Sequence, residues 1–285
     1  MSSNRPIQLG LCCLNTTLKK LDPPVYPSRT MIMRMIEEKG IDELKSRILK
    51  NLQDLLLMIE WNEQNGIRVF RLSSDLFPHK TNHKVEDYSF DFAKDLLRQV
   101  GALANKYGHR LTFHPGQYNQ VGAKTRDVYE KTILDLGLHA KIFDIMGMGK
   151  DSIMVIHGGG VYNDKTATID RWKRQFLEMP ESIRDRLVFE NCEKSYCIED
   201  IIPISEYLNI PIVHDTHHYT CYKHYNPDFN QKSADDLMLP VVDTWRRRNI
   251  KPKFHISEQG SGRIGHHSDY VETIPDYLLE IPEKY

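Results

Sequence analysis

Cysteine is scarce in this chain and forms no C-x-x-C pair. Five cysteines occur among 285 residues, at positions 12, 13, 192, 197 and 221. An odd number without paired spacing argues against a disulfide framework and fits free thiols in a reducing compartment. The chain also lacks an apolar run near the ~20 residues of a membrane span, and no secretion signal follows its N-terminus. We therefore expect a soluble, intracellular protein that does not bind membranes.

Strong charge and nucleotide-binding motifs are also missing. The formal net charge is −1, which neither supports nor excludes a nucleic-acid partner, because a local basic groove can exist on a neutral protein. No G-x-G-x-x-G follows a predicted strand, and no Gly-Lys-Ser/Thr follows Gly158–Gly160, which disfavours dinucleotide and P-loop sites. Histidine, in contrast, is plentiful: the chain has 13, and histidine is the commonest metal ligand.

Short apolar segments alternate with helical patterns along the whole chain. Strands are predicted at 7–13, 67–72, 110–113, 152–156, 187–189, 210–213 and 253–256. Helices are predicted at 41–65, 90–106, 126–146, 166–177, 198–208 and 234–248, with a last helix from about Asp269. This alternation predicts an α/β fold with a parallel sheet and outer helices. The number of units favours a TIM-type (β/α) barrel over an open doubly wound sheet.

The predicted barrel forms one catalytic domain over residues 1–285. The segment from Leu14 to Lys39 is its longest irregular stretch. A barrel of this type closes with eight strands, and no eighth strand is predicted before Tyr285. We therefore expect the barrel to be incomplete at its C-terminal end.

Ionisable residues recur at the ends of consecutive predicted strands, where active sites of this fold lie. They are His114, His157, Glu190, the pair His214 and Asp215, and His255. A lone histidine at such a place is more often structural. Ionisable residues at the ends of five consecutive strands are harder to explain by packing. Burying such groups together costs free energy unless cations or hydrogen bonds compensate their charge. The pattern therefore predicts a metal site.

The residue types narrow the metal and the chemistry. Imidazoles and carboxylates without thiolates suit zinc, manganese or iron(II). The candidates exceed the need of one ion, and a shared carboxylate such as Glu190 could bridge two ions. Clusters of two or more metals commonly serve phosphoryl transfer. Near the predicted site, Gln117 and Tyr118 follow His114 on a loop, where they could contact unstacked bases or form an ordinary surface loop.

Several motifs together resemble a known family. The segments are, in chain order, RLSSDLFPH, TFHPGQYNQ, VIHGGG, VFEN, HDTHH, KFHIS and HHSDY. They resemble the UV damage endonucleases, which are barrel nucleases related to endonuclease IV, and the similarity runs from Leu9 to about Tyr270. The resemblance implies two to three divalent ions per chain, manganese or alternatively zinc. The implied ligands are His114, His157, Glu190, Asp215, His218, His255 and His267.

The same resemblance implies further roles. Lys253 matches a lysine that can carry a carbamate beside the metals, and Lys253, Glu190 and His255 are the implied catalytic residues. Gln117 and Tyr118 match a pair that wedges into the duplex, and Asn15 matches a residue lining the lesion pocket. The implied partner of this monomer is double-stranded DNA with distorting lesions. The implied reaction cuts the phosphodiester immediately 5′ of UV photoproducts and similar lesions, leaving a 3′-hydroxyl and a 5′-phosphate.

The chain departs from the family pattern at two places. Leu11 stands where the family usually has a lesion-probing tyrosine. The family also places a final metal-binding glutamate on the eighth strand, and neither Glu258, Glu272 nor Glu280 has that context. Two alternatives therefore stay open: a sugar isomerase built on the same scaffold, and a fragment that binds damaged DNA without cutting it.

Overall fold

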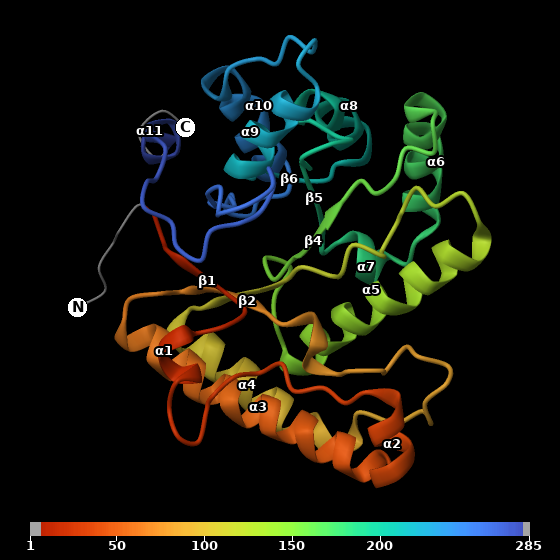
Figure 1. Ribbon diagram of the computed structural model, residues 1–285, viewed down its shortest axis with the longest axis vertical. Coiled ribbons are helices and arrows are strands. Elements are labelled where there is room, and N and C mark those ends of the chain that lie inside the picture. The colour runs from red at the N-terminus through yellow and green to blue at the C-terminus, as the bar shows by residue number, and fades with distance from the viewer. Residues whose placement is uncertain (1–6, 282–285) are drawn as a thin grey trace. The chain divides into compact units, whose positions relative to one another are not determined.

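Residues 7–281 are described by a computed structural model (Figure 1). They fall into two units. The N-terminal unit comprises Gln8–Gly116 and Leu134–Met154, and the C-terminal unit comprises Gln117–Ile133 and the chain from Val155 onward, with Ile7. Residues 1–6, on which the expected absence of a secretion signal rests, lie outside the described residues. No helix within 7–281 is long and apolar enough to cross a membrane.

Parallel strands run through the N-terminal unit in chain order. They are β1 (Gly10–Cys12), β2 (Val69–Leu72) and β3 (Arg110–Phe113), and Phe113 also pairs with Met154, the first residue of β4 (Met154–His157). The helical segments of this part are α1 (Thr16–Lys19), α2 (Met33–Lys39), α3 (Ile41–Gln64), η1 (Ser74–Leu76), η2 (Asp91–Ala93) and α4 (Lys94–Tyr107). Helix α5 (Arg126–Met146) begins in the C-terminal unit and ends in the N-terminal one.

Helices α3 and α4 lie side by side in the N-terminal unit (Figure 1). Leu44, Ile48, Leu52, Leu55 and Ile59 recur at helical spacing on α3 and are fully buried. This apolar stripe, rather than helix propensity alone, stabilises α3 against its neighbours. Helix α4 ends at Gly108, whose φ of 67° is the left-handed conformation that favours glycine at a helix C-terminus.

Strands β4, β5 (Leu187–Glu190) and β6 (Ile212–Val213) are neighbours in the C-terminal unit. The helices of this unit are α6 (Lys165–Glu178), α7 (Glu181–Arg184), α8 (Ile198–Leu208), α9 (Thr216–Tyr225), α10 (Ala234–Arg246) and α11 (Asp276–Leu279). Trp172 of α6 stacks on Phe189 of β5 with ring centroids 4.7 Å apart. Trp245 of α10 is fully buried and donates to the carbonyl of Ile212 at 2.7 Å. These contacts hold the helices against the strands that carry the candidate site.

The predicted α/β fold of TIM type is confirmed within residues 7–281 by six strands in chain order that alternate with helices. The predicted bounds of β3, α5 and α8 are confirmed without change. The predicted strand 253–256 is wrong as a strand, because His255 makes only an isolated parallel bridge with Asp215. Pro252 has no backbone N–H, so it cannot donate a hydrogen bond that would extend the strand pairing.

Three helical predictions need correction. The last helix begins at Asp276 rather than near Asp269, because Pro275 disfavours helical backbone at the residue before it. Residues 14–39 are not wholly irregular, since they contain α1 and α2. Helix α9 was not predicted, although it starts three residues after the end of β6 and carries His217 and His218.

Gly101 of α4 lies against the last residue of α5 so closely that a Cβ there would be 1.7 Å from the carbonyl oxygen of Met146. We expect Gly101→Ala to lower the free energy of unfolding by about 1–3 kcal/mol, the usual cost of overpacking. This cost should exceed the gain of about 0.5–1 kcal/mol from alanine in a helix. Urea unfolding would measure it, with exposed Ala102→Ser on the same helix as a control. An unchanged midpoint for Gly101→Ala would contradict the close packing.

Candidate metal centre

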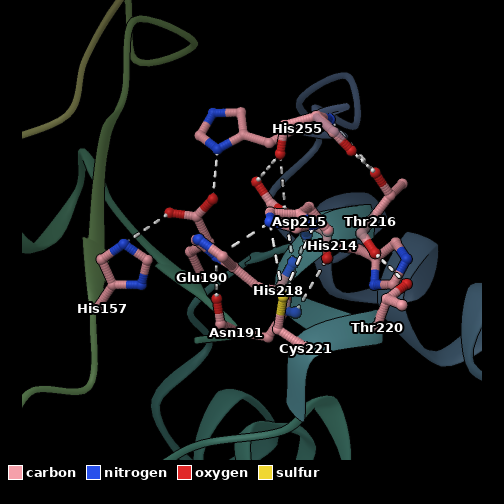
Figure 2. A network of polar contacts seen from close by, with 12 residues as sticks. His157, Glu190, Asn191, His214, Asp215, Thr216, His218, Thr220, Cys221 and His255 are labelled. Carbon is pink, nitrogen blue, oxygen red and sulfur yellow. Dashed lines mark hydrogen bonds and ion pairs between the residues drawn. The ribbon is translucent and has the colours of Figure 1, made fainter. Parts of the chain in front are cut away.

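The ends of β4, β5 and β6 bring ionisable side chains together in the C-terminal unit (Figure 2). His157 is the last residue of β4, Glu190 is the last of β5, and Asp215 lies two residues after the end of β6. Neighbouring parallel strands place their carboxyl ends at one edge of the sheet, which is why residues far apart in sequence meet here. The predicted cluster in this unit therefore has a structural basis.

Glu190 is at the middle of the cluster and is 1% exposed. Its Oε2 lies 3.3 Å from Nε2 of His157, and its Oε1 is hydrogen-bonded to Nδ1 of His255 (Figure 2). Each carboxylate oxygen thus faces an imidazole. A carboxylate this deeply buried is costly unless cations or hydrogen bonds compensate it, and the two rings supply that compensation.

The ring of His218 is oriented by a contact with the backbone. Its Nδ1 lies 3.0 Å from the carbonyl oxygen of Asn191. A carbonyl oxygen only accepts, so Nδ1 carries the hydrogen and the neutral ring keeps its lone pair on Nε2. One ligand atom each from His157, Glu190 and His218 lies within 4.8 Å of the others. Two imidazoles and a carboxylate at this spacing fit a divalent ion.

Asp215 links the cluster to helix α9. It is 3% exposed, and its Oδ1 accepts from the backbone N–H of His218 at 2.8 Å, which caps the helix. Burial raises the pKa of Asp215 to about 6, against the opposing effect of His218. Burial opposes charge on His218, but the carboxylates of Asp215 and Glu190 outweigh it and raise the pKa of the imidazole. A cation in this cluster would favour the ionised form of Asp215.

Lys253 extends the contacts of Glu190 through His255. Its Nζ is hydrogen-bonded to Nε2 of His255, and both residues are buried. An ammonium group only donates, so Nε2 accepts and Nδ1 donates its hydrogen to Glu190. The residues Lys253, His255 and Glu190 therefore form one directed chain of hydrogen bonds.

His267 joins the cluster from the segment after the isolated bridge. Its ring centroid lies 5.5 Å from that of His218 and 5.0 Å from that of His217. His217 was not predicted as a site residue, yet it is 5% exposed and its Nε2 lies 3.6 Å from Sγ of Cys221. Burial and the neighbouring His267 lower the pKa of His217. The sequence feature that could have identified His217 is the pair of adjacent histidines, 217 and 218, that follows Asp215, a residue type that favours a helix N-cap.

The other predicted site residues lie as follows. In the N-terminal unit, half-buried His114 follows β3 and its carbonyl accepts from Oγ of Ser74 at 2.8 Å. Asn15 is buried and caps α1 by accepting from the N–H of Leu18 at 3.0 Å, a structural role that the sequence did not suggest. In the C-terminal unit, Gln117 and Tyr118 are exposed.

His214 gives the metal-free protein a defined pH dependence. It is fully buried beside the hydroxyl of Tyr277, and burial lowers its pKa to about 4. Below about pH 6.5 this histidine is protonated in the unfolded chain but stays neutral in the folded chain. Protonation therefore favours the unfolded state, and the free energy of unfolding decreases as the pH falls towards 4. Relative to His214→Phe, the wild type should lose on the order of 3 kcal/mol of unfolding free energy between pH 7 and pH 4.

Urea unfolding in EDTA at several pH values measures this difference. Exposed His224→Phe serves as the control and should follow the wild type across the range. A difference between wild type and His214→Phe that does not change with pH would contradict the prediction.

Comparison with known proteins identifies the family and similar structures. A family profile described as UV-endonuclease UvdE matches residues 7–283. A protein of Acanthamoeba polyphaga mimivirus, provisionally named a UV-damage endonuclease, is 39% identical over 98% of this chain and 84% of its own length. A UV-damage endonuclease of Schizosaccharomyces pombe is 37% identical over 97% of this chain, which spans 49% of that protein. The crystal structure of SacUVDE superposes with a TM-score of 0.83 at 26% identity, covering 93% of this chain and 86% of that one.

Proposed function

The chain belongs to the UV-endonuclease UvdE family, and we propose that it is a metal-dependent DNA-repair endonuclease. The proposed reaction cuts the phosphodiester immediately 5′ of UV photoproducts and other distorting lesions, leaving a 3′-hydroxyl and a 5′-phosphate. The observation that supports it most is the buried Glu190 carboxylate between His157 and His255, with His218 oriented beside it. A deeply buried acid surrounded by imidazoles is typical of a metal centre rather than of a packed core.

The proposed ligands in the C-terminal unit are His157, Glu190, Asp215, His218, His255 and His267, with His114 as a further ligand from the N-terminal unit. We propose two to three divalent ions, manganese or alternatively zinc. Such ions activate water and stabilise charge on phosphate oxygens when bound. The two oxygens of Glu190 already face different imidazoles, which suits a carboxylate shared between neighbouring ions.

Lys253, His255 and Glu190 are the proposed catalytic residues. In the present arrangement Lys253 donates to His255, and His255 donates to Glu190, so the chain's own groups orient the carboxylate. A carbamate on Lys253, as the family resemblance implies, would replace the ammonium group by an anion beside the same ring.

Gln117, Tyr118 and Asn15 are the proposed DNA-contacting residues. Tyr118 is 64% exposed, and Gln117 beside it is also exposed. An exposed aromatic ring can stack on a base, and a damaged pair unstacks at lower cost than an intact one. The proposed monomer would therefore recognise duplex distortion more than base sequence.

Replacing Glu190 tests the proposed reaction. Wild-type protein with Mn²⁺ should nick UV-irradiated supercoiled plasmid, leave unirradiated plasmid intact and stop in EDTA. Glu190→Gln should reduce the nicking rate about 100-fold or more, because it removes a charged metal ligand from the centre of the cluster. The exposed Glu178→Gln on α6 is the control and should nick at the wild-type rate.

Other results would contradict the proposed function. Binding of irradiated DNA without nicking by the wild type would favour a non-cleaving binding protein. Ketose–aldose exchange without nicking would favour the sugar isomerase.

A second test concerns the proposed contact with DNA. Tyr118→Ala should weaken binding to a lesion-bearing duplex about 10- to 100-fold, which corresponds to the loss of one aromatic stacking partner. Fluorescence anisotropy in EDTA would measure affinity without cleavage. Tyr207→Ala is a matched control, because Tyr207 of α8 is 66% exposed and was not assigned to the DNA-binding loop. Equal effects of the two substitutions would exclude a specific role for Tyr118.

A further inference from the structure

Asn191 follows Glu190 directly at the end of β5 and is 1% exposed. Its side-chain amide spans the backbone of Asp215: Oδ1 accepts from the N–H at 2.7 Å, and Nδ2 donates to the carbonyl at 3.1 Å (Figure 2). The amide group thus presents one acceptor and one donor to Asp215, as a neighbouring strand would.

This contact continues the sheet where its backbone ladder has ended. Strand β6 has two residues, and its pairing with β5 stops at Glu190 and Val213. Asp215 lies two residues beyond Val213, outside that pairing, so the side chain of Asn191 takes the place of a backbone partner. The position of Asp215 relative to Glu190 is therefore set by a side chain rather than by the ladder.

The backbone of Asn191 acts on a second residue of the cluster. Its carbonyl oxygen accepts from Nδ1 of His218 at 3.0 Å, which leaves the lone pair of the neutral ring on Nε2. Asn191 is thus the sequence neighbour of Glu190. Its side-chain amide is hydrogen-bonded to the backbone of Asp215, and its backbone carbonyl is hydrogen-bonded to the ring of His218. Asn191 therefore connects the proposed ligand Glu190 on β5 with Asp215, which caps α9, and with His218 on that helix.

We propose that Asn191 is a positioning residue of the metal centre, holding Asp215 and His218 in the geometry that binds the ions. This inference rests on the proposed function, because it presupposes that the cluster binds metal. Asn191 acts on the ions only through its neighbours. Outer partners of this kind commonly change metal affinity 10- to 100-fold when they are replaced.

The same chain offers a matched control for a purely structural role. Asn51 of α3 is fully buried and spans the backbone of Arg29 in the same way, accepting from its N–H at 2.8 Å and donating to its carbonyl at 3.0 Å. Loss of either amide should lower the stability of the metal-free protein. Only the loss at position 191 should change metal binding.

The experiment titrates the full-length protein with Mn²⁺ alone and follows free Mn²⁺ by electron paramagnetic resonance. Asn191→Leu keeps the side-chain volume but removes both amide bonds, and it should weaken Mn²⁺ binding about 10- to 100-fold. Asn51→Leu should bind Mn²⁺ like the wild type. Unfolding in EDTA should show a comparable loss of stability in both variants.

Asn191→Asp provides a second measurement, at pH 8, in case Asn191→Leu does not fold. It keeps the acceptor for the N–H of Asp215 but replaces the donor by oxygen. An added carboxylate favours a divalent cation by charge, so weaker Mn²⁺ binding in this variant would support a loss of geometry. Wild-type affinity in folded Asn191 variants would overturn the positioning role alone. Absence of Mn²⁺ binding by the wild type would overturn the proposed metal centre and, with it, this inference.

Discussion

The compensation of one buried carboxylate organises the C-terminal unit. Glu190 is almost fully enclosed, and its two oxygens meet an imidazole each, from His157 and His255. Without those partners, or a cation in their place, the charge would oppose folding of β5. His255 in turn accepts a hydrogen bond from Lys253. The need to compensate the charge of Glu190 therefore determines where side chains from separate segments lie.

The assembly of this cluster depends little on a long backbone ladder. Strand β6 is short, and the segment around His255 contributes only an isolated bridge. Side-chain hydrogen bonds hold these segments where strand pairing has ended: Asp215 caps α9, and Asn191 is hydrogen-bonded to the backbone of Asp215. The proposed ligands therefore lie on elements joined by specific polar contacts, which makes their relative positions sensitive to single substitutions.

Electrostatics and family membership lead to the same chemistry. Burial raises the pKa of Asp215, and the adjacent carboxylates raise that of His218 against the opposing effect of its burial. Coordination of divalent ions would favour the neutral imidazole and the charged carboxylate. The chain belongs to the UvdE family, and the SacUVDE structure shares its fold.

The sequence by itself determined the α/β alternation, the bounds of β3, α5 and α8, and the strand-end residues from which the cluster is built. Those features are local: apolar periodicity sets the element type, and parallel strands bring their ends to one edge. Only the tertiary structure decided that residues 253–256 form a single bridge, that Asp215 caps a helix beginning at Thr216, and that Asn191 and His217 belong to the cluster. These depend on partners distant in the sequence, because a cap, a bridge or a side-chain clamp exists only once the segment that receives its hydrogen bonds is in place.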